Sequence, residues 1–485
     1  MSDPDARSMR IAPKLLSAGI AMVLLVSACA LNTAPDRDTL IHEELPNMKM
    51  PAAWVEPSKA GVVEDNWVAA LGDQQLSALV VEAITYNSDL RIAAARVEAA
   101  EAGVKAAGAQ MYPSVTLLGR TGGKVGGDGS GIGGVIVPAS WEIDLWGRVR
   151  YGRRAAEDQY ASAEADAAAA AQSVAALVAK SWFLAIEARQ QHDLAAEMVT
   201  SARGSLRLSE DRKRIGPGSE LEVNQADASL QTLLDVQQQL DQALAQALRS
   251  LELLLGRYPA AEIQTPTAFA ALPATPAAGV PSELLERRPD VIAAQRRIEA
   301  AFNLAGQAEA ARLPQISLTA GLSSITSETF VLQNRDNPQV GFGATLFGTL
   351  FDFGRLEAQA DARRAEQKQA AAIWAQTGLK AFGEVEGALS AEATLRNREP
   401  LLVAAVRQNN DALSLETTRY RIGSNDMRSV LQQQQALYSS RSALLRVQAE
   451  QHVNRVNLYL ALGGGFGAGP ALTPPAVAST NPEAN

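Results

Sequence analysis

The sequence is poor in the side chains on which most enzymes and metal proteins depend. Aromatic residues make up 5% of it, and it has three histidines and one cysteine. So few imidazole and thiolate groups leave almost nothing with which to build a transition-metal site. The 44 Lys and Arg residues are outnumbered by 53 Asp and Glu residues, so a basic footprint for nucleic acid is lacking. Alanine is unusually common, which favours helices packed at short range over a thick globular core.

The single cysteine stands at the end of a segment that is typical of a bacterial signal peptide. Arg10 and Lys14 precede the apolar run Leu15–Val26. The 12 residues of this run are too few to span a bilayer as a helix. The run leads into Val26-Ser27-Ala28-Cys29, where small residues before a cysteine resemble the bacterial lipobox. We therefore expect a covalent lipid on Cys29 and no other cofactor. The alternative is a buried or incidental cysteine.

The rest of the chain contains an internal duplication, in which similar motifs recur in the same order. Asn87-Ser88-Asp89-Leu90 corresponds to Arg288-Pro289-Asp290-Val291 at an offset of 201 residues. Trp146-Gly147-Arg148 corresponds to Phe353-Gly354-Arg355 at an offset of 207 residues. The insertion of six residues falls where a loop tolerates it. An internal duplication of this length predicts two copies of one structural unit.

Each repeat has the same series of elements: an Ala-rich helix, a Gly-rich β-hairpin, a very long helix, a short turn and a last helix. At 1.5 Å per residue the long helix of the first repeat reaches about 95 Å, which is too long for a compact domain. In the first repeat, 76–256, the first helix is predicted at 76–111, the hairpin at about 113–146, the long helix at 150–213 and the last helix at 220–256. The second repeat, 282–462, holds them at 282–312, about 314–351, 356–420 and 427–462. The other parts are a signal peptide, 1–28, a lipid-anchored segment, 29–75, an equatorial linker, 257–281, and a flexible tail, 463–485.

The hairpin segments alternate between apolar and polar residues with a period of two. The alternation runs through 141–145, 316–322 and 340–346, with Phe342 on the apolar face and Thr319 on the polar face. Such strands fit a transmembrane sheet with a lipid face and a water face. An ordinary half-buried sheet of a soluble protein alternates in the same way, and the lipobox favours the membrane.

Two hairpins supply four strands, which are too few to close a barrel, because barrels begin at about eight strands. An open sheet edge in lipid leaves backbone groups unpaired, at a cost of several kcal/mol each. Strands that span a membrane must therefore be pooled between copies of the chain. Two copies give eight strands, whose barrel is filled by side chains, and three give twelve, which leave room for an aqueous pore.

Three sequence marks carry a resemblance to the TolC/OprM-type outer-membrane efflux factors. They are Leu284 to Asp290 (Leu-Leu-Glu-Arg-Arg-Pro-Asp), Trp141 to Arg148 (Trp-Glu-Ile-Asp-Leu-Trp-Gly-Arg) and Phe351 to Arg355 (Phe-Asp-Phe-Gly-Arg). The resemblance covers roughly residues 50–465. It looks strongest to the lipoproteins that serve resistance-nodulation-division pumps.

The resemblance implies a mainly α fold with a transmembrane β portion, assembled as a homotrimer. Three copies would form a 12-stranded outer-membrane β-barrel, a long periplasmic α-helical barrel and a small mixed equatorial belt. The protein would be a lipid-anchored channel, the exit duct of a tripartite efflux pump, and not an enzyme. Its partners would be outer-membrane lipid, a periplasmic adaptor and an inner-membrane resistance-nodulation-division pump. Drugs or other small toxic compounds would pass through it.

Two turns with the sequence Arg-Ile-Gly join the long helix of each repeat to the last helix. Gly216 and Gly423 suit a helix C-cap with positive φ. The resemblance implies that this end faces the adaptor. Polar neighbours of the glycines then become candidates for adaptor docking: Arg214, Ser219, Arg421, Asn425 and Asp426. A plain turn between helices explains the glycines equally well.

One position departs from the family pattern. Many relatives carry a Leu-Asp pair just after the second turn, which rings the periplasmic constriction, and the corresponding residues here are Arg428 and Gln432. A neutral glutamine cannot form a carboxylate ring, which counts against an acidic gate. A ring of Arg428 side chains would repel cations. The two residues are therefore gate candidates, and a solvated helix face is the alternative.

Two other functions stay open beside the efflux channel. A type I protein-secretion duct resembles this fold but usually lacks the lipid anchor, and a non-conducting lipid-anchored envelope scaffold would lack a pore. The Gly-rich stretch 126–131 opens no helix, so it fits a hairpin loop better than a nucleotide cradle. Eight methionines and three histidines, none clustered, give no support to copper or silver export.

Overall fold

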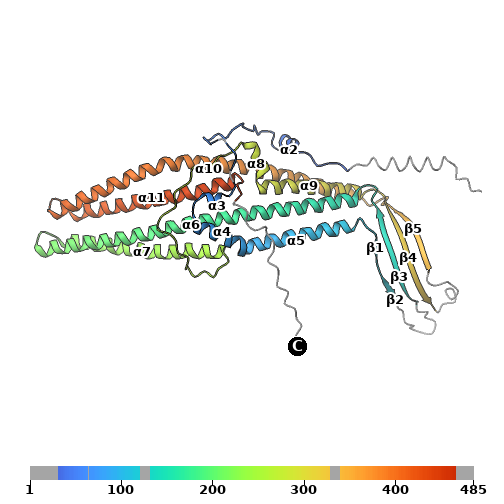
Figure 1. The fold of residues 1–485 in the computed structure, drawn as a ribbon, viewed down its shortest axis with the longest axis horizontal. Coiled ribbons are helices and arrows are strands. Elements are labelled where there is room, and N and C mark those ends of the chain that lie inside the picture. The colour runs from blue at the N-terminus through green and yellow to red at the C-terminus, as the bar shows by residue number, and fades with distance from the viewer. Residues whose placement is uncertain (1–30, 60, 64, 121–131, 328–338, 466–485) are drawn as a thin grey trace, which may run out of the picture. The chain divides into compact units, whose positions relative to one another are not determined.

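The computed structural model describes residues 31–59, 61–63, 65–120, 132–327 and 339–465 (Figure 1). Cys29, the signal peptide, the Gly-rich stretch 126–131 and most of the predicted tail lie outside the described residues. The chain divides into two compact units. The first consists of Met1–Asn47, Val97–Glu164 and Ala293–Ala375, and the second of Met48–Arg96, Ala165–Ile292 and Gln376–Asn485.

The first unit contains one antiparallel sheet in which the two predicted hairpins pair with each other (Figure 1). Its strands are β1 (Ser114–Val115), β2 (Leu118–Arg120), β3 (Ile132–Ile143), β4 (Gln315–Ser327) and β5 (Gln339–Phe347). Both β1 and β2 pair with β3, which pairs with β4, which in turn pairs with β5. The predicted hairpins are therefore present, and their junction is the contact of β3 with β4.

The edge strand is interrupted between β1 and β2 because a proline lies opposite the gap. The Pro138 carbonyl accepts a hydrogen bond from the Thr116 N–H at 2.9 Å, but Pro138 has no N–H to donate in return. The register nevertheless continues unchanged, since Val115 pairs with Ala139 and Leu118 with Ile136. We therefore treat β1 and β2 as one edge, which we call β1–β2.

The predicted strand over 141–145 is two residues too long. The structure ends β3 at Ile143, after which the Leu145 N–H donates to the Ile143 carbonyl at 2.8 Å in a turn. The Asp144 carboxylate accepts hydrogen bonds from the backbone N–H groups of Val149 and Arg150 at 3.1 and 2.9 Å. A carboxylate that satisfies the first N–H groups of a helix stabilises the helix start, so the chain leaves the sheet here.

The predicted long and last helices are confirmed. The long helices are α6 (Arg148–Ile215) and α10 (Arg355–Arg421), and the last helices are α7 (Glu220–Leu254) and α11 (Met427–Ala461). Helix α10 continues through Pro400, although proline removes one hydrogen bond and crowds the preceding turn. The shorter helices α2 (Arg37–Glu44) and α3 (Trp67–Ala70) lie before the first repeat.

The first helix of each repeat is broken, where the sequence predicted a continuous one. Asn87 separates α4 (Gln74–Tyr86) from α5 (Ser88–Ala109), and Arg288 separates α8 (Pro281–Arg287) from α9 (Pro289–Ala310). Both separating residues are extended, with ψ of 131° and 121°. Proline at 289 disfavours the helical conformation of the residue before it. The Asn87 side chain accepts the N–H of Asp89 at 2.9 Å and so caps the new helix.

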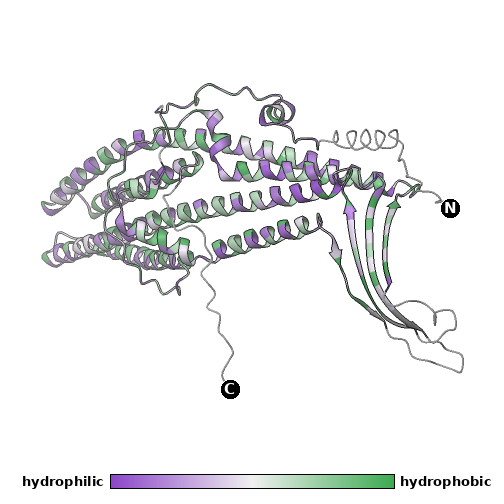
Figure 2. Ribbon diagram, turned by 45° about the vertical axis from the view of Figure 1, so that its right-hand side comes forward, coloured by the Kyte–Doolittle hydropathy of each residue, from purple (hydrophilic) through white to green (hydrophobic). Residues whose placement is uncertain are grey.

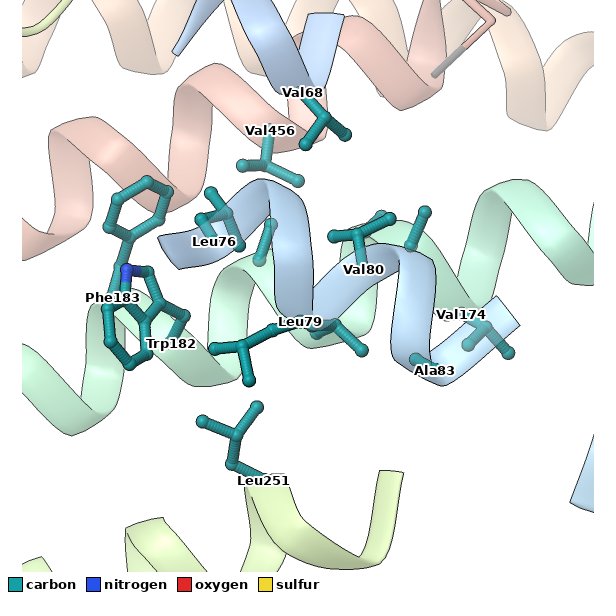
Figure 3. Packing of buried hydrophobic residues seen from close by; sticks show 14 of the residues in the cluster. Val68, Leu76, Leu79, Val80, Ala83, Val174, Trp182, Phe183, Leu251 and Val456 are labelled. Atoms are coloured by element: carbon teal, nitrogen blue, oxygen red, sulfur yellow. The ribbon is translucent and has the colours of Figure 1, made fainter. Parts of the chain in front are cut away.

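The largest apolar core belongs to the second unit. Side chains from α3, α4, α6, α7 and α11 meet there, and Figure 3 shows Leu76, Leu79, Trp182, Leu251 and Val456 converging. The apolar stretch that makes α6 hydrophobic enough to cross a bilayer is 56% buried, and it supplies much of this core. Its hydrophobicity is therefore explained by packing. Along the helices of Figure 2 hydrophilic and hydrophobic residues alternate, as amphipathic packing requires.

The linker 257–281 is fastened by a buried ion pair. The Arg455 guanidinium binds the Glu392 carboxylate at 2.5 Å, and the two side chains are 2% and 12% exposed. Arg455 also donates to the Pro273 carbonyl, and the ring of His452 lies 3.0 Å from the Ala270 carbonyl oxygen. The linker contains no helix or strand element between Leu254 and Pro281, so side chains of the surrounding helices supply many of its hydrogen bonds. The Glu252 carboxylate of α7 also accepts the N–H of Ala261 at 2.7 Å, and the Gln190 amide of α6 donates to the Thr267 carbonyl at 3.0 Å.

Candidate functional site: the sheet and the two helix turns

The register of the sheet gives it one apolar and one polar face. Ala320 lies opposite Phe342, whereas the neighbouring Thr319 lies opposite Gly343. Because successive side chains of a strand point to opposite faces, Phe342 and Thr319 are on different faces, as predicted. Phe342 is 86% exposed. The apolar face is made of Val115, Val137, Ala139, Trp141, Ile143, Ile316, Leu318, Ala320, Leu322, Val340, Phe342, Ala344 and Leu346.

Both edges of the sheet lack a neighbouring strand within the described residues. Strands β1–β2 pair only with β3, and β5 pairs only with β4. Each edge therefore presents backbone N–H and C=O groups that none of the strands β1 to β5 in the described part of the chain satisfies. An exposed edge of this kind is a template for pairing with another chain.

Exposed aromatic side chains gather at the end of the sheet that leads into the helices. Phe351 and Phe353 are 76% and 90% exposed, and their ring centroids are 4.5 Å apart. Tyr112, just before β1, is also exposed. The indole N–H of Trp146 donates to the Pro314 carbonyl at 2.7 Å, which fixes the ring at the start of the second hairpin. Aromatic residues in such a band are typical of the interface between membrane and water.

The turn after α6 is a glycine C-cap, as predicted. Gly216 has φ of +109°, and its N–H reaches the carbonyls of Arg212 and Lys213 at 3.1 and 3.2 Å. Ser219 then caps α7: its hydroxyl accepts the Glu222 N–H at 3.3 Å, and the Glu222 carboxylate accepts the Ser219 N–H at 3.2 Å. Arg214 is exposed and pairs with Asp211. Ser219 thus has a structural role that the docking hypothesis did not include.

The turn after α10 has the same design with different side chains. Gly423 has φ of +82°, and its N–H donates to the Tyr420 carbonyl at 3.1 Å. Asp426 caps α11 by accepting the Ser429 N–H at 3.0 Å, and Asn425 binds Glu416. Arg421 is exposed at the end of α10. Asp426 and Asn425 are therefore used within the turn, while Arg421 is directed to solvent.

A link between the two turns was missed by the sequence reading. The Arg212 guanidinium donates to the Tyr420 carbonyl at 2.9 Å and lies 4.2 Å from the centre of the Tyr420 ring. Tyr420 is buried, and its burial, together with the charge of Glu222, raises the pKa of the phenol. The link joins residues 208 positions apart, so no local pattern announces it.

The gate candidates Arg428 and Gln432 both lie on an exposed face of α11. The neighbours Met427, Val430 and Gln434 point the other way and are buried. Gln434 donates to the hydroxyls of Ser201 and Ser205 on α6 at 3.0 and 2.8 Å. The run of four glutamines is thus divided: residue 434 ties two helices together and residue 432 faces solvent.

In the motif Arg288-Pro289-Asp290 a buried guanidinium is paired with two partly exposed carboxylates. Arg288 pairs with Asp290 at 2.8 Å and with Glu384 of α10 at 2.6 Å, and donates to the Ala461 carbonyl at the end of α11. Burial alone raises the pKa of Asp290, but the hydrogen bond and the charge of Arg288 outweigh it and lower the pKa below its ordinary value. In the first repeat the side chain of Asn87 donates to the equivalent carbonyl of Leu254 at 2.9 Å. The motif therefore acts in assembly of the helices.

These features define a class. Paired long helices that lead from a small sheet with one apolar face, two free edges and an aromatic band are the parts of an outer-membrane channel with a helical periplasmic portion.

Comparison with known proteins gives the family. The model of the family described as outer membrane efflux protein matches residues 79–257 and 280–464. The chain belongs to this family, and the resemblance seen in the sequence is confirmed. Its place in the outer membrane and its general function in efflux are those of the family.

Individual relatives match over nearly their whole length. The pyoverdine export outer membrane protein OpmQ of Pseudomonas aeruginosa is 30% identical over 470 residues, which are 92% of this chain and 96% of OpmQ. The cation efflux system protein CusC of Escherichia coli O6:H1 is 29% identical over 467 residues, 93% of this chain and 99% of CusC. The solved structure of the outer-membrane channel OprN has a TM-score of 0.77 at 27% identity, over 90% of this chain and 99% of OprN.

Proposed function

We propose that the protein is the exit duct of a tripartite efflux pump. Three copies pool their strands into a 12-stranded barrel in the outer membrane, and their long helices form a barrel in the periplasm. The observation that carries this proposal is the sheet, with its continuous apolar face and two unpaired edges. Such a sheet in lipid requires partners on both edges, since each unpaired backbone group costs several kcal/mol there.

The cargo of the duct belongs to the class of small toxic compounds. The relatives are named for different cargoes, pyoverdine for OpmQ and cations for CusC, at nearly the same identity to this chain. Similar ducts with such different cargoes support a passive channel whose selectivity lies in the inner-membrane pump. We propose a pump of the resistance-nodulation-division class as that partner.

A covalent lipid on Cys29 anchors the mature N-terminus in the membrane. The support is the order of basic residues, apolar run and small residues before the cysteine. Fatty-acid labelling of cells should mark the wild-type protein and should vanish in Cys29→Ala. Labelling that persists in the variant would remove the assignment.

The two turns meet the periplasmic adaptor. Each copy contributes one turn per repeat, so a trimer presents six similar tips with Gly216 and Gly423 at their ends. Arg421 and Arg214 are exposed beside the glycines, and Ser219, Asn425 and Asp426 shape the same tips by capping. The exposed Arg428 in the first turn of α11, and the exposed Gln432 one turn further along, line the constriction of the duct.

Export by cells tests this function against its two competitors. Deletion of the gene should raise the accumulation of fluorescent dyes and the sensitivity to drugs, and a plasmid copy should reverse both effects. Normal dye efflux in the deletion strain, combined with loss of a secreted polypeptide, would support a type I secretion duct instead. Normal dye efflux with a weakened envelope and unaltered secretion would support the scaffold.

A further inference from the structure

We propose that β5 of one copy pairs with β1–β2 of the next copy in a defined register, with Leu350 opposite Val115 of the partner subunit. The same register sets Phe347 opposite the partner's Leu118. This inference rests on the proposed trimer and goes further, because a free antiparallel edge can dock in several registers. A shift by one residue would exchange the two faces of the joined sheet.

The two hairpins are equivalent in sequence before and after the hairpin loop. Pro113 and Pro314, which precede the first strand of each hairpin, are 201 residues apart. Trp146 and Phe353, which follow the second strand, are 207 residues apart. The first strands of the two hairpins therefore correspond at an offset of 201 residues, and the second strands at an offset of 207 residues.

The backbone pairing obeys these offsets. In the first hairpin Val115 pairs with Ala139, and in the second Ile316 pairs with Leu346. Ile316 lies 201 residues after Val115, and Leu346 lies 207 residues after Ala139. The duplication of the sequence is thus also a duplication of the strand register.

The junction of the two hairpins supplies a template for the junction of two copies. There the second strand of one hairpin, β3, meets the first strand of the next, β4, and Ile143 pairs with Ile316. The residue that corresponds to Ile143 in the second hairpin is Leu350, and the residue that corresponds to Ile316 in the first is Val115. Val115 belongs to the free edge β1–β2, and Leu350 lies three residues after the free edge strand β5, so the equivalent junction joins two copies and extends β5 to Leu350.

The exposed side chains agree with this register. Leu350 is fully exposed and Val115 is 67% exposed, and the register makes them neighbours on the apolar face. On the polar face, the two free edges carry one large apolar side chain each among the residues discussed: Phe347 on β5, and Leu118 on β1–β2, which pairs with Ile136 of β3. Phe347 and Leu118 are 67% and 57% exposed. The register sets these two opposite each other, so that each covers the other.

A disulfide between copies tests the register. Directly opposite Cβ atoms of antiparallel strands are about 4.5–5.5 Å apart, whereas diagonal neighbours are about 7–8 Å apart. The variant Leu350→Cys with Val115→Cys, in the full chain in outer membranes, is treated with a mild oxidant and run on a non-reducing gel. We expect at least tenfold more covalently joined dimers and trimers than in each single variant. The single variants also serve as the control for disulfides formed with Cys29.

Matched pairs sample the other registers. Leu350→Cys with Thr116→Cys probes a shift of one residue, and Leu350→Cys with Leu117→Cys a shift of two. Thr349→Cys with Thr116→Cys probes the proposed register again, on the other face, and decides the question if the first pair does not assemble. Cross-links at Leu117 in place of Val115, in a protein that is still trimeric by native mass measurement, would overturn the register alone. A monomeric wild-type protein would overturn the trimer of the proposed function.

Discussion

At the scale of the residue, the chain separates positions that build the fold from positions that face the surroundings. Ser219 and Asp426 were expected at an adaptor interface, and the structure uses both as helix caps. Arg421, Arg428 and Gln432 are exposed as an interface or a lumen requires. A docking or gating role for those three is therefore separable from helix stability, which makes them the better positions for mutation.

The strand faces give the first prediction. Phe342→Asp places a charge on the proposed lipid face, where penalties reach about 2–4 kcal/mol for Arg or Lys at mid-bilayer and are smaller for Asp or Glu. We expect strongly reduced assembly in the outer membrane. Thr319→Asp lies on the other face and should assemble almost normally. The amount of trimer in outer-membrane fractions decides, and equal loss in both variants would mean that the faces are assigned wrongly.

The charge cluster at Arg288 gives a prediction about pH. The folded pKa of Asp290 is lowered, so its contribution to stability is complete above its unfolded pKa of about 3.9 and disappears as the pH falls through the lower folded pKa. Asp290→Asn should cost at most about 1 kcal/mol at pH 7, because the carboxylate is partly exposed to solvent. Thermal unfolding followed by circular dichroism should show the difference between wild type and variant shrinking below pH 4. A difference that stays constant down to pH 3 would contradict the assignment.

At the scale of the element, the sequence predicted the helices well because their signals are local. The high alanine content, the Arg-Ile-Gly turns and the duplication together predicted every end of the long and last helices to within two residues. The breaks at Asn87 and Arg288 were missed, although Pro289 carried a signal for one of them. Pro400 is the opposite case, because a proline there favours a break in the helix, yet α10 continues through it.

Other features of the elements could not be read from local patterns. The Arg212–Tyr420 link and the Arg455–Glu392 pair join residues that lie far apart in the chain and only meet once the helices pack. The pairing of the two hairpins through β3 and β4 could likewise not be predicted from the alternation of apolar and polar residues. Alternation gives the face on which a side chain lies and not the identity of the neighbouring strand.

The turns give a prediction for one element. Gly423→Pro fixes φ near −65° where the turn has +82°, and it removes the N–H that binds the Tyr420 carbonyl. Expression and trimers should persist, because the change is confined to the tip, while dye efflux falls by at least tenfold. Gly423→Asn is the matched control, since asparagine tolerates positive φ, and it should keep most of the efflux. Full efflux in Gly423→Pro and in Gly216→Pro would remove the docking hypothesis.

At the scale of the whole molecule, a single chain leaves several of its surfaces without a partner. One chain supplies an apolar sheet face, two free sheet edges and an exposed aromatic band. Each of these is unfavourable in water for a lone chain, and all are satisfied together in a closed barrel that crosses a membrane.

The proposed gate at Arg428 gives a further prediction. Arg428→Ala should raise the resting conductance of the duct. An unchanged conductance and ion selectivity would mean that Arg428 lies on an ordinary solvated helix face.

Single-channel recording of the purified protein in planar lipid bilayers is the most direct test of the duct itself. The protein is added to one side of the bilayer at low concentration, with Phe342→Asp as a matched sample that should insert poorly. The account predicts discrete and uniform conductance steps from a species whose native mass is that of three chains. Stable trimers that insert into the bilayer and pass no current would contradict it.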